Sequence, residues 1–150
     1  MILGILKHVA QRIERYYSSI SDRPSFVRRL FGSRRTDPLR YEHVIVHSDA
    51  EGYYVPQDFE RVIFPAKALK IPGGMIGSVP RLLQECRGLA KLLEIPAGLD
   101  IESDEVLEAA ESPGSGKAKW QRYGIESFSC LRLMAACEAS LKAGAAIVFC

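Results

Sequence analysis

The stretch that most constrains the fold is residues 41–64, YEHVIVHSDAEGYYVPQDFERVIF. As a strand, its first eight positions would place Tyr41, His43, Ile45 and His47 on one face and Glu42, Val44, Val46 and Ser48 on the other. The acidic segment 49–52 ends in a glycine that can adopt positive φ, which favours a tight turn. Residues 53–55 resume extended structure until proline removes a backbone donor. The pattern predicts a hairpin, with 61–64 as a third short strand.

Two helices with recognisable ends follow this hairpin. The first is expected over residues 79–94, because Ser78 is a good N-cap and Pro80 fits the first turn. A short helix over 104–111 should follow Ser103, with acidic residues in the first turn where the macrodipole favours them.

The last third of the chain is predicted to be helical and then extended. Residues 117–143 form one helix, or two that meet near Gly124, and Gly144 suits the position just past a helix end. The apolar run 145–150 has strand length and predicts a buried central strand. The fold class is therefore α+β: a small, mainly antiparallel sheet of three to five strands with two main helices on one face.

Residues 1–40 are expected to form a unit apart from the globular domain 41–150. They carry nine Lys and Arg against three Asp and Glu, a balance of +6, whereas residues 41–150 carry eleven against fifteen, a balance of −4. Residues 1–20 have an apolar stripe at helical spacing, which predicts an amphipathic helix. This helix either docks on its own domain, binds a partner or a second copy, or lies on a membrane surface. Residues 21–40 read as a basic linker, with nucleic-acid binding much less favoured.

The cysteine pattern and the hydropathy favour a soluble protein of a reducing compartment. None of the four cysteines lies in a C-x-x-C spacing, so free buried thiols are expected rather than disulfides or a zinc cluster. No run is long enough for a transmembrane helix, and the start lacks signal-peptide features. We therefore expect a cytoplasmic location. The cysteines are Cys86, Cys130, Cys137 and Cys150.

No motif for catalysis or cofactor binding stands out, and we expect neither a cofactor nor a metal. On a strand, His43 and His47 would lie about 13 Å apart, too far for one metal. His47 and Asp49 would need Asp58 or another acid to complete a zinc site. The glycine-rich segment 73–78 precedes a helix N-terminus, where anions bind, but it lacks a phosphate-binding spacing, so a tight turn and a cap explain it equally well.

The polar and aromatic residues best suited to recognition fall in two regions, the hairpin and the start of the last helix. If the two regions adjoin, they form an aromatic and acidic binding surface; otherwise the aromatic residues only cover the edge of the core. The candidate binding residues are His47, Asp49, Glu51, Tyr54, Asp58, Trp120, Arg122 and Glu126.

Three segments resemble a set of small uncharacterised bacterial proteins. They are HSDAEGYYVPQDF at 47–59, GSVPRLLQE at 77–85 and ACEASLKAGAAIVF at 136–149. The resemblance covers residues 41–150, with residues 1–40 as an addition, and it implies a bacterial cytoplasmic domain without implying an activity or a catalytic residue.

These observations together predict a non-enzymatic protein-interaction domain of the toxin-neutralising or regulatory type. An acidic loop beside a plausible core would suit a basic protein partner or self-association, with nucleic acid not expected. The alternative is a small enzyme or ligand-binding module that uses His47, Asp49 and Asp58.

Overall fold

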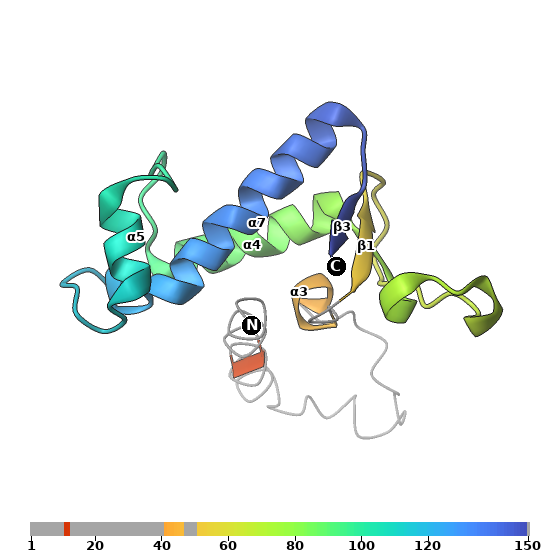
Figure 1. The fold of residues 1–150 in the computed structure, drawn as a ribbon, viewed down its shortest axis with the longest axis horizontal. Helices are drawn as coiled ribbons and strands as arrows, with labels where there is room; N and C mark the ends of the chain where they lie inside the picture. Colours follow the sequence, from red (N-terminus) through yellow and green to blue (C-terminus); the bar gives the residue numbers. More distant parts are fainter. Residues whose placement is uncertain (1–10, 13–40, 47–50, 150) are drawn as a thin grey trace, which may run out of the picture.

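The computed structural model describes residues 11–12, 41–46 and 51–149. This part of the chain is an α+β fold, which confirms the predicted class (Figure 1). The N-terminal helix predicted for residues 1–20 lies outside the described residues, apart from Gln11 and Arg12, which are helical. The helices are α3 (Glu42–Ile45), α4 (Val79–Leu93), α5 (Asp104–Glu111), α6 (Lys119–Arg122) and α7 (Gly124–Ala143), and the strands are β1 (Gly52–Val55), β2 (Ile76–Ser78) and β3 (Ile147–Phe149).

The sheet has three strands in the order β2-β1-β3 and is mixed rather than mainly antiparallel. β1 pairs in parallel with β2 and antiparallel with β3, so that Tyr54 lies opposite Gly77 on one side and Ile147 on the other. The prediction of a central strand at 145–150 is wrong, because β3 lies at the sheet edge. Ile147 and Phe149 pack against the core, whereas the side chain of Val148 is 52% exposed.

The first half of the predicted hairpin is a helical turn, α3, and not a strand. The reason is a contact with a distant residue: the Glu85 carboxylate accepts the backbone N–H groups of His43 (3.1 Å) and Val44 (2.8 Å). These amides belong to the first turn, where a helix leaves its N–H groups without partners. An acceptor on another element thus decides the local conformation, and no pattern within residues 41–48 could show it.

The predicted third strand, 61–64, forms only an isolated bridge. Ile63 exchanges two backbone hydrogen bonds of 2.9 Å with Ile76. The neighbouring Val62 N–H donates instead to the Glu42 carboxylate, at 3.0 Å. Because this donor goes to a side chain, the strand pairing does not extend along the chain.

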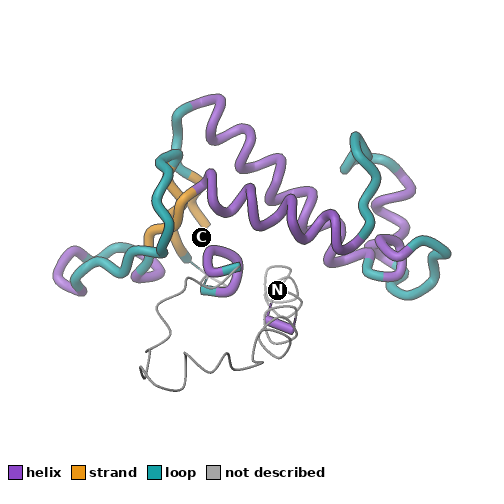
Figure 2. The backbone as a smooth tube through the Cα atoms, turned by 180° about the vertical axis from the view of Figure 1, so that it is seen from behind, coloured by secondary structure: helices purple, strands orange, loops and turns teal. Residues whose placement is uncertain are grey.

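Helices α4 and α7 run antiparallel along most of the molecule and carry the main core (Figures 1 and 2). Cys86, Cys130 and Cys137 are buried free thiols between them, as predicted. The Cys130 thiol donates to the Cys86 carbonyl at 3.2 Å, and burial raises the pKa of Cys137 to about 12. Thiols in this state are not reactive nucleophiles. The buried hydrophobic residues of this core are Tyr41, Val44, Tyr54, Val62, Met75, Val79, Leu82, Leu83, Cys86, Leu89, Cys130, Leu133 and Cys137.

The predicted helix ends are largely confirmed. The Ser78 hydroxyl accepts the Arg81 N–H at 3.4 Å, and Gly144 has the left-handed φ of 64° just past α7. Ser103 does occupy the N-cap position of α5, but its hydroxyl donates to the Asp100 carbonyl at 2.7 Å instead of accepting from the helix. The last helical region is two helices, α6 and α7, which meet at Tyr123 and Gly124.

A second, smaller core lies at the far end of α4 and α7 from the sheet (Figure 1). Trp120 of α6 packs there with Val106 and Ala109 of α5. Gly124 lets α7 begin directly against α5, because a Cβ at this position would lie 1.8 Å from the Ala109 carbonyl oxygen. This close approach fixes where α5 sits on the body of the protein.

Two helical glycines give a matched test of that approach. Gly124→Ala should lower the free energy of unfolding by about 1–3 kcal/mol, because the backbone of α5 must shift. Gly88→Ala, whose Cβ would make an ordinary 3.6 Å contact with Tyr41, should leave stability unchanged or raise it by up to about 1 kcal/mol. Urea denaturation of both variants measures the difference. Equal stability of the two would contradict the tight packing of α7 on α5.

Candidate functional site

A long acidic segment without basic residues lies on and around α5. Residues 92–116 contain seven Asp and Glu and no Lys or Arg. This run was not singled out from the sequence, where only Asp104 and Glu105 were explained, as first-turn residues of a helix. The absence of basic residues was a usable signal. The acids are Glu94, Asp100, Glu102, Asp104, Glu105, Glu108 and Glu111.

Helix α5 presents four of these carboxylates to solvent. Val106 and Ala109 are buried, so the helix lies on the body through that side and exposes Asp104, Glu105, Glu108 and Glu111. At a rise of about 1.5 Å per residue the four charges span about 10.5 Å of helix axis, or one charge per about 3.5 Å. The individual intervals are about 1.5, 4.5 and 4.5 Å, so about 3.5 Å is the mean axial spacing of this row of negative charge.

The described residues leave most of this row without a counter-charge. Glu105 accepts a hydrogen bond from the Gln121 side chain at 2.9 Å. Asp104, Glu108 and Glu111 have no hydrogen bond or ion pair to any described side chain. Basic residues of α6 and α7 pair instead with flanking acids: Lys119 with Glu94 at 3.4 Å and Arg132 with Glu102 at 3.1 Å. We refer to Asp104, Glu105, Glu108 and Glu111 as the α5 acidic row.

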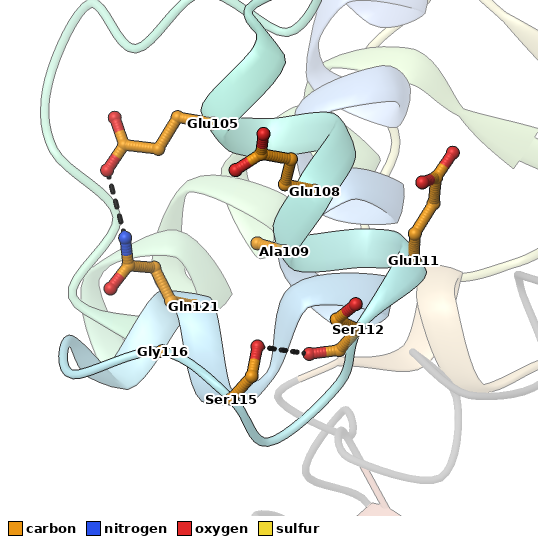
Figure 3. Close-up of a pocket in the computed structure, with 8 residues that line it drawn as sticks. All are labelled: Glu105, Glu108, Ala109, Glu111, Ser112, Ser115, Gly116 and Gln121. Atoms are coloured by element: carbon orange, nitrogen blue, oxygen red, sulfur yellow. Dashed lines mark hydrogen bonds between the residues drawn. The ribbon is translucent and has the colours of Figure 1, made fainter.

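A hollow of about 300 Å³ lies beside the α5 acidic row, between α5 and the loop that leads to α6 (Figure 3). Glu105, Glu108 and Glu111 line one side, and Ser112, Ser115 and Gln121 line the other. The Ser115 hydroxyl donates to the Ser112 carbonyl at 2.7 Å, which helps to hold the loop in place. The row therefore borders a concave surface.

The hairpin residues predicted to bind a partner are mostly engaged within the protein. His47 and Asp49 lie outside the described residues. The exposed Glu51 accepts the Gly73 N–H at 3.2 Å. Asp58 takes two hydrogen bonds from Arg81, at 2.6 Å from Nε and 3.3 Å from Nη2. Both acids therefore brace the loops around β1.

Tyr54 and His43 belong to a buried polar network. The Tyr54 hydroxyl donates to the His43 carbonyl at 2.5 Å, and His43 Nδ1 lies 3.1 Å from Glu85 Oε1. Burial, followed by the nearby Glu85 charge, raises the pKa of Tyr54 far above its usual value. A tyrosine in this state acts as a neutral hydrogen-bond donor, so this network supports α3 and β1.

The second predicted group lies at the other end of the molecule. Trp120 is buried in the smaller core, and its carbonyl accepts the Ser127 hydroxyl at 2.8 Å. Arg122 donates to the Lys117 carbonyl at 3.0 Å, and Glu126 is half-buried in the first turn of α7. The structure therefore does not join this group to Tyr54, which lies in the main core.

Metal-binding groups and membrane-spanning helices can be assessed only for the described residues. Among them, no group of three or more His, Cys, Asp and Glu side chains is arranged to hold a metal ion. Nor does any helix within residues 11–12, 41–46 and 51–149 have the length and apolar character needed to cross a membrane.

A comparison with known families assigns the chain. Residues 7–149 match the sequence model of a family described as "Putative DNA-mimic protein". The chain belongs to this DNA-mimic family. No curated protein and no solved structure matches it.

Membership of the DNA-mimic family corrects two predictions. The predicted toxin-neutralising or regulatory domain is wrong, as is the alternative of a small enzyme or ligand-binding module at His47, Asp49 and Asp58, because the family points to mimicry of DNA. The partner prediction is also wrong, because it named self-association or an unspecified protein and did not expect nucleic acid. A DNA mimic instead interacts with DNA-binding proteins. The acidic loop was considered as a surface for a basic partner, but at the hairpin and not at α5.

Removing the Glu85 carboxylate should show that the hairpin network is structural. Glu85→Ala leaves three buried donors without an acceptor and should lower the free energy of unfolding by about 3 kcal/mol or more. Glu138→Ala removes an acid from an exposed pair with Arg87, in which both side chains are more than half exposed, and should change stability by less than about 1 kcal/mol. Urea denaturation compares the two. A Glu85 variant as stable as the Glu138 variant would show that α3 does not depend on this carboxylate.

Proposed function

We propose that this protein binds the DNA-binding surface of a DNA-binding protein and competes with DNA for it, with the α5 acidic row in place of a run of phosphates. The observation that carries the proposal is the axial spacing of the carboxylates. One strand of B-DNA carries a charge per about 3.4 Å of helix axis. The α5 acidic row carries one per about 3.5 Å on average.

The setting of the row supports the same role. A DNA-binding surface offers Lys and Arg side chains that form charge-assisted hydrogen bonds to phosphate oxygens. Carboxylate oxygens accept the same bonds. Asp104, Glu108 and Glu111 remain available for them, since no described Lys or Arg pairs with these acids. The hollow beside the row gives an incoming side chain room between α5 and the loop 112–116.

The rigidity of α5 also favours recognition. Its buried side packs on Trp120, and Gly124 brings α7 directly against it, so the carboxylates are held on a fixed helix and not on a mobile loop. A preformed row of charges loses less conformational entropy on binding than a flexible acidic tail does.

Charge-neutral variants of the row test the proposal. The host's soluble DNA-binding proteins are first collected on double-stranded DNA cellulose and then applied to the immobilised full chain. We expect specific proteins to be retained, to elute on addition of double-stranded DNA, and to bind less as salt rises. Asp104→Asn/Glu108→Gln/Glu111→Gln should weaken retention at least about tenfold, taking one charged contact as about 1.5–3 kcal/mol.

The matched control removes three charges at the other end of the molecule. Glu51→Gln/Glu60→Gln/Glu138→Gln has the same change in net charge and should retain the same proteins as the parent chain. Proteins that do not elute with DNA would contradict competition with DNA. Equal losses in both triple variants would show that only net charge matters, and that α5 is not the binding element.

A further inference from the structure

The connection between β1 and β2 contains a surface loop of unusual composition. Residues 64–74, FPAKALKIPGG, contain seven apolar residues, two lysines and two glycines. Exposed loops normally carry Ser, Thr, Asn and Asp, which bond to water and to the backbone. This loop has none of these and no acidic residue. Its side chains are therefore poorly matched to water.

None of this apolar surface is used to build the core. No residue from 64 to 74 is buried, and Phe64 and Leu69 are 66% and 65% exposed, with Ile63 at the base 47% exposed. Lys67 lies between Phe64 and Leu69 in the sequence, and Lys70 directly follows Leu69. The loop stands out from the sheet, at the opposite end of the molecule from α5 (Figures 1 and 2).

The loop has a defined shape. Its ends are joined by the two hydrogen bonds between Ile63 and Ile76, and its interior forms two short 3₁₀ turns, η1 (Lys67–Leu69) and η2 (Pro72–Gly74). Gly73 lies so close to β1 that a Cβ would stand 2.1 Å from the Glu51 carbonyl oxygen. Two prolines restrict the loop further. Because the loop is preformed, it loses little conformational entropy when Phe64 and Leu69 bind to another surface.

We propose that residues 63–70 bind an anionic lipid surface, with Phe64 and Leu69 entering the interfacial region and Lys67 and Lys70 meeting the headgroups. Aromatic and aliphatic side chains that are flanked by basic residues are the usual chemistry of surface-bound membrane segments. Each lysine adds attraction to a negatively charged leaflet. This inference stands apart from the proposed DNA mimicry, because it involves a different end of the molecule.

The charges around the loop leave its tip cationic. Arg61 is paired with the buried Glu42 at 2.9 Å, and Arg81 is paired with Asp58, so neither pair contributes a net charge. Glu51 and Glu60 lie at the base, where Glu51 is bonded to the Gly73 N–H. No Asp or Glu occurs between residues 61 and 84. The projecting part therefore carries only the two lysines.

A bilayer suits this surface better than a protein groove does. The apolar side chains are borne on a projecting loop, so a protein partner would need a matching concavity, whereas a lipid interface adapts to a projecting shape. Cationic residues beside the apolar ones favour an anionic surface over a neutral one. Docking into a protein is the outcome that the test must separate from lipid binding.

A tryptophan placed on the loop reports contact with lipid directly. The chain has a single tryptophan, so Trp120→Phe/Phe64→Trp gives emission from the loop alone. With vesicles of phosphatidylglycerol and phosphatidylcholine in equal parts, we expect a shift of the emission to shorter wavelength and protection from acrylamide. Vesicles of phosphatidylcholine alone should give neither. An unshifted emission with both vesicles would overturn the proposal.

Vesicle sedimentation of the full chain, with Trp120 retained, provides an independent measurement. Phe64→Ser/Leu69→Ser should lose most of its binding to the anionic vesicles, and Lys67→Gln/Lys70→Gln should bind roughly 25-fold more weakly, at about fivefold per lysine. Leu141→Ser/Val148→Thr alters two exposed apolar residues elsewhere and should bind like the parent chain. Equal sedimentation of the loop variants and the parent would overturn lipid binding by the loop. Capture of a host protein that depends on Phe64 and Leu69, without vesicle binding, would show that the loop docks on protein instead.

Discussion

The packing of α4 against α7 is the constraint on which the rest of the structure depends. The two helices bury Leu82, Leu89 and Cys130 between them and separate the sheet from the α5 region (Figure 1). The short elements are completed at the two ends of this pair: β3 follows α7 directly, and α5 is held where α7 begins at Gly124. Neither the three-residue strands nor the eight-residue α5 would be stable alone.

Features of the fold that depend on residues close together in the sequence were predictable. Ser78 before a proline-containing turn and Gly144 after a long helical pattern mark helix ends through local chemistry, and both positions hold in the structure. The strand predicted at 41–48 failed because its conformation depends on Glu85, more than forty positions away. The edge position of β3 likewise depends on which strands pair, and an apolar run such as 145–150 does not contain that information.

The proposed binding surface was harder to predict than the fold. Asp104 and Glu105 fit the first turn of a helix so well that a structural role explained them completely. What distinguishes the α5 acidic row is the absence of described basic partners for Asp104, Glu108 and Glu111, and this is a property of the folded surface. Conversely, Glu51 and Asp58 looked available in the sequence, but the structure shows them bonded to Gly73 and Arg81.

A net charge of +2 is compatible with DNA mimicry because charges act locally in salt solution. At physiological ionic strength the electrostatic influence of an exposed charge decays over about 8 Å. Helix α4 has fifteen residues and is therefore about 22 Å long, and it lies between the lysines of the loop 64–74 and the α5 region. Those lysines are too distant to neutralise the α5 acidic row. An approaching DNA-binding surface thus meets the field of α5 and its immediate neighbours, and the lysines of the loop 64–74 have little effect on this encounter.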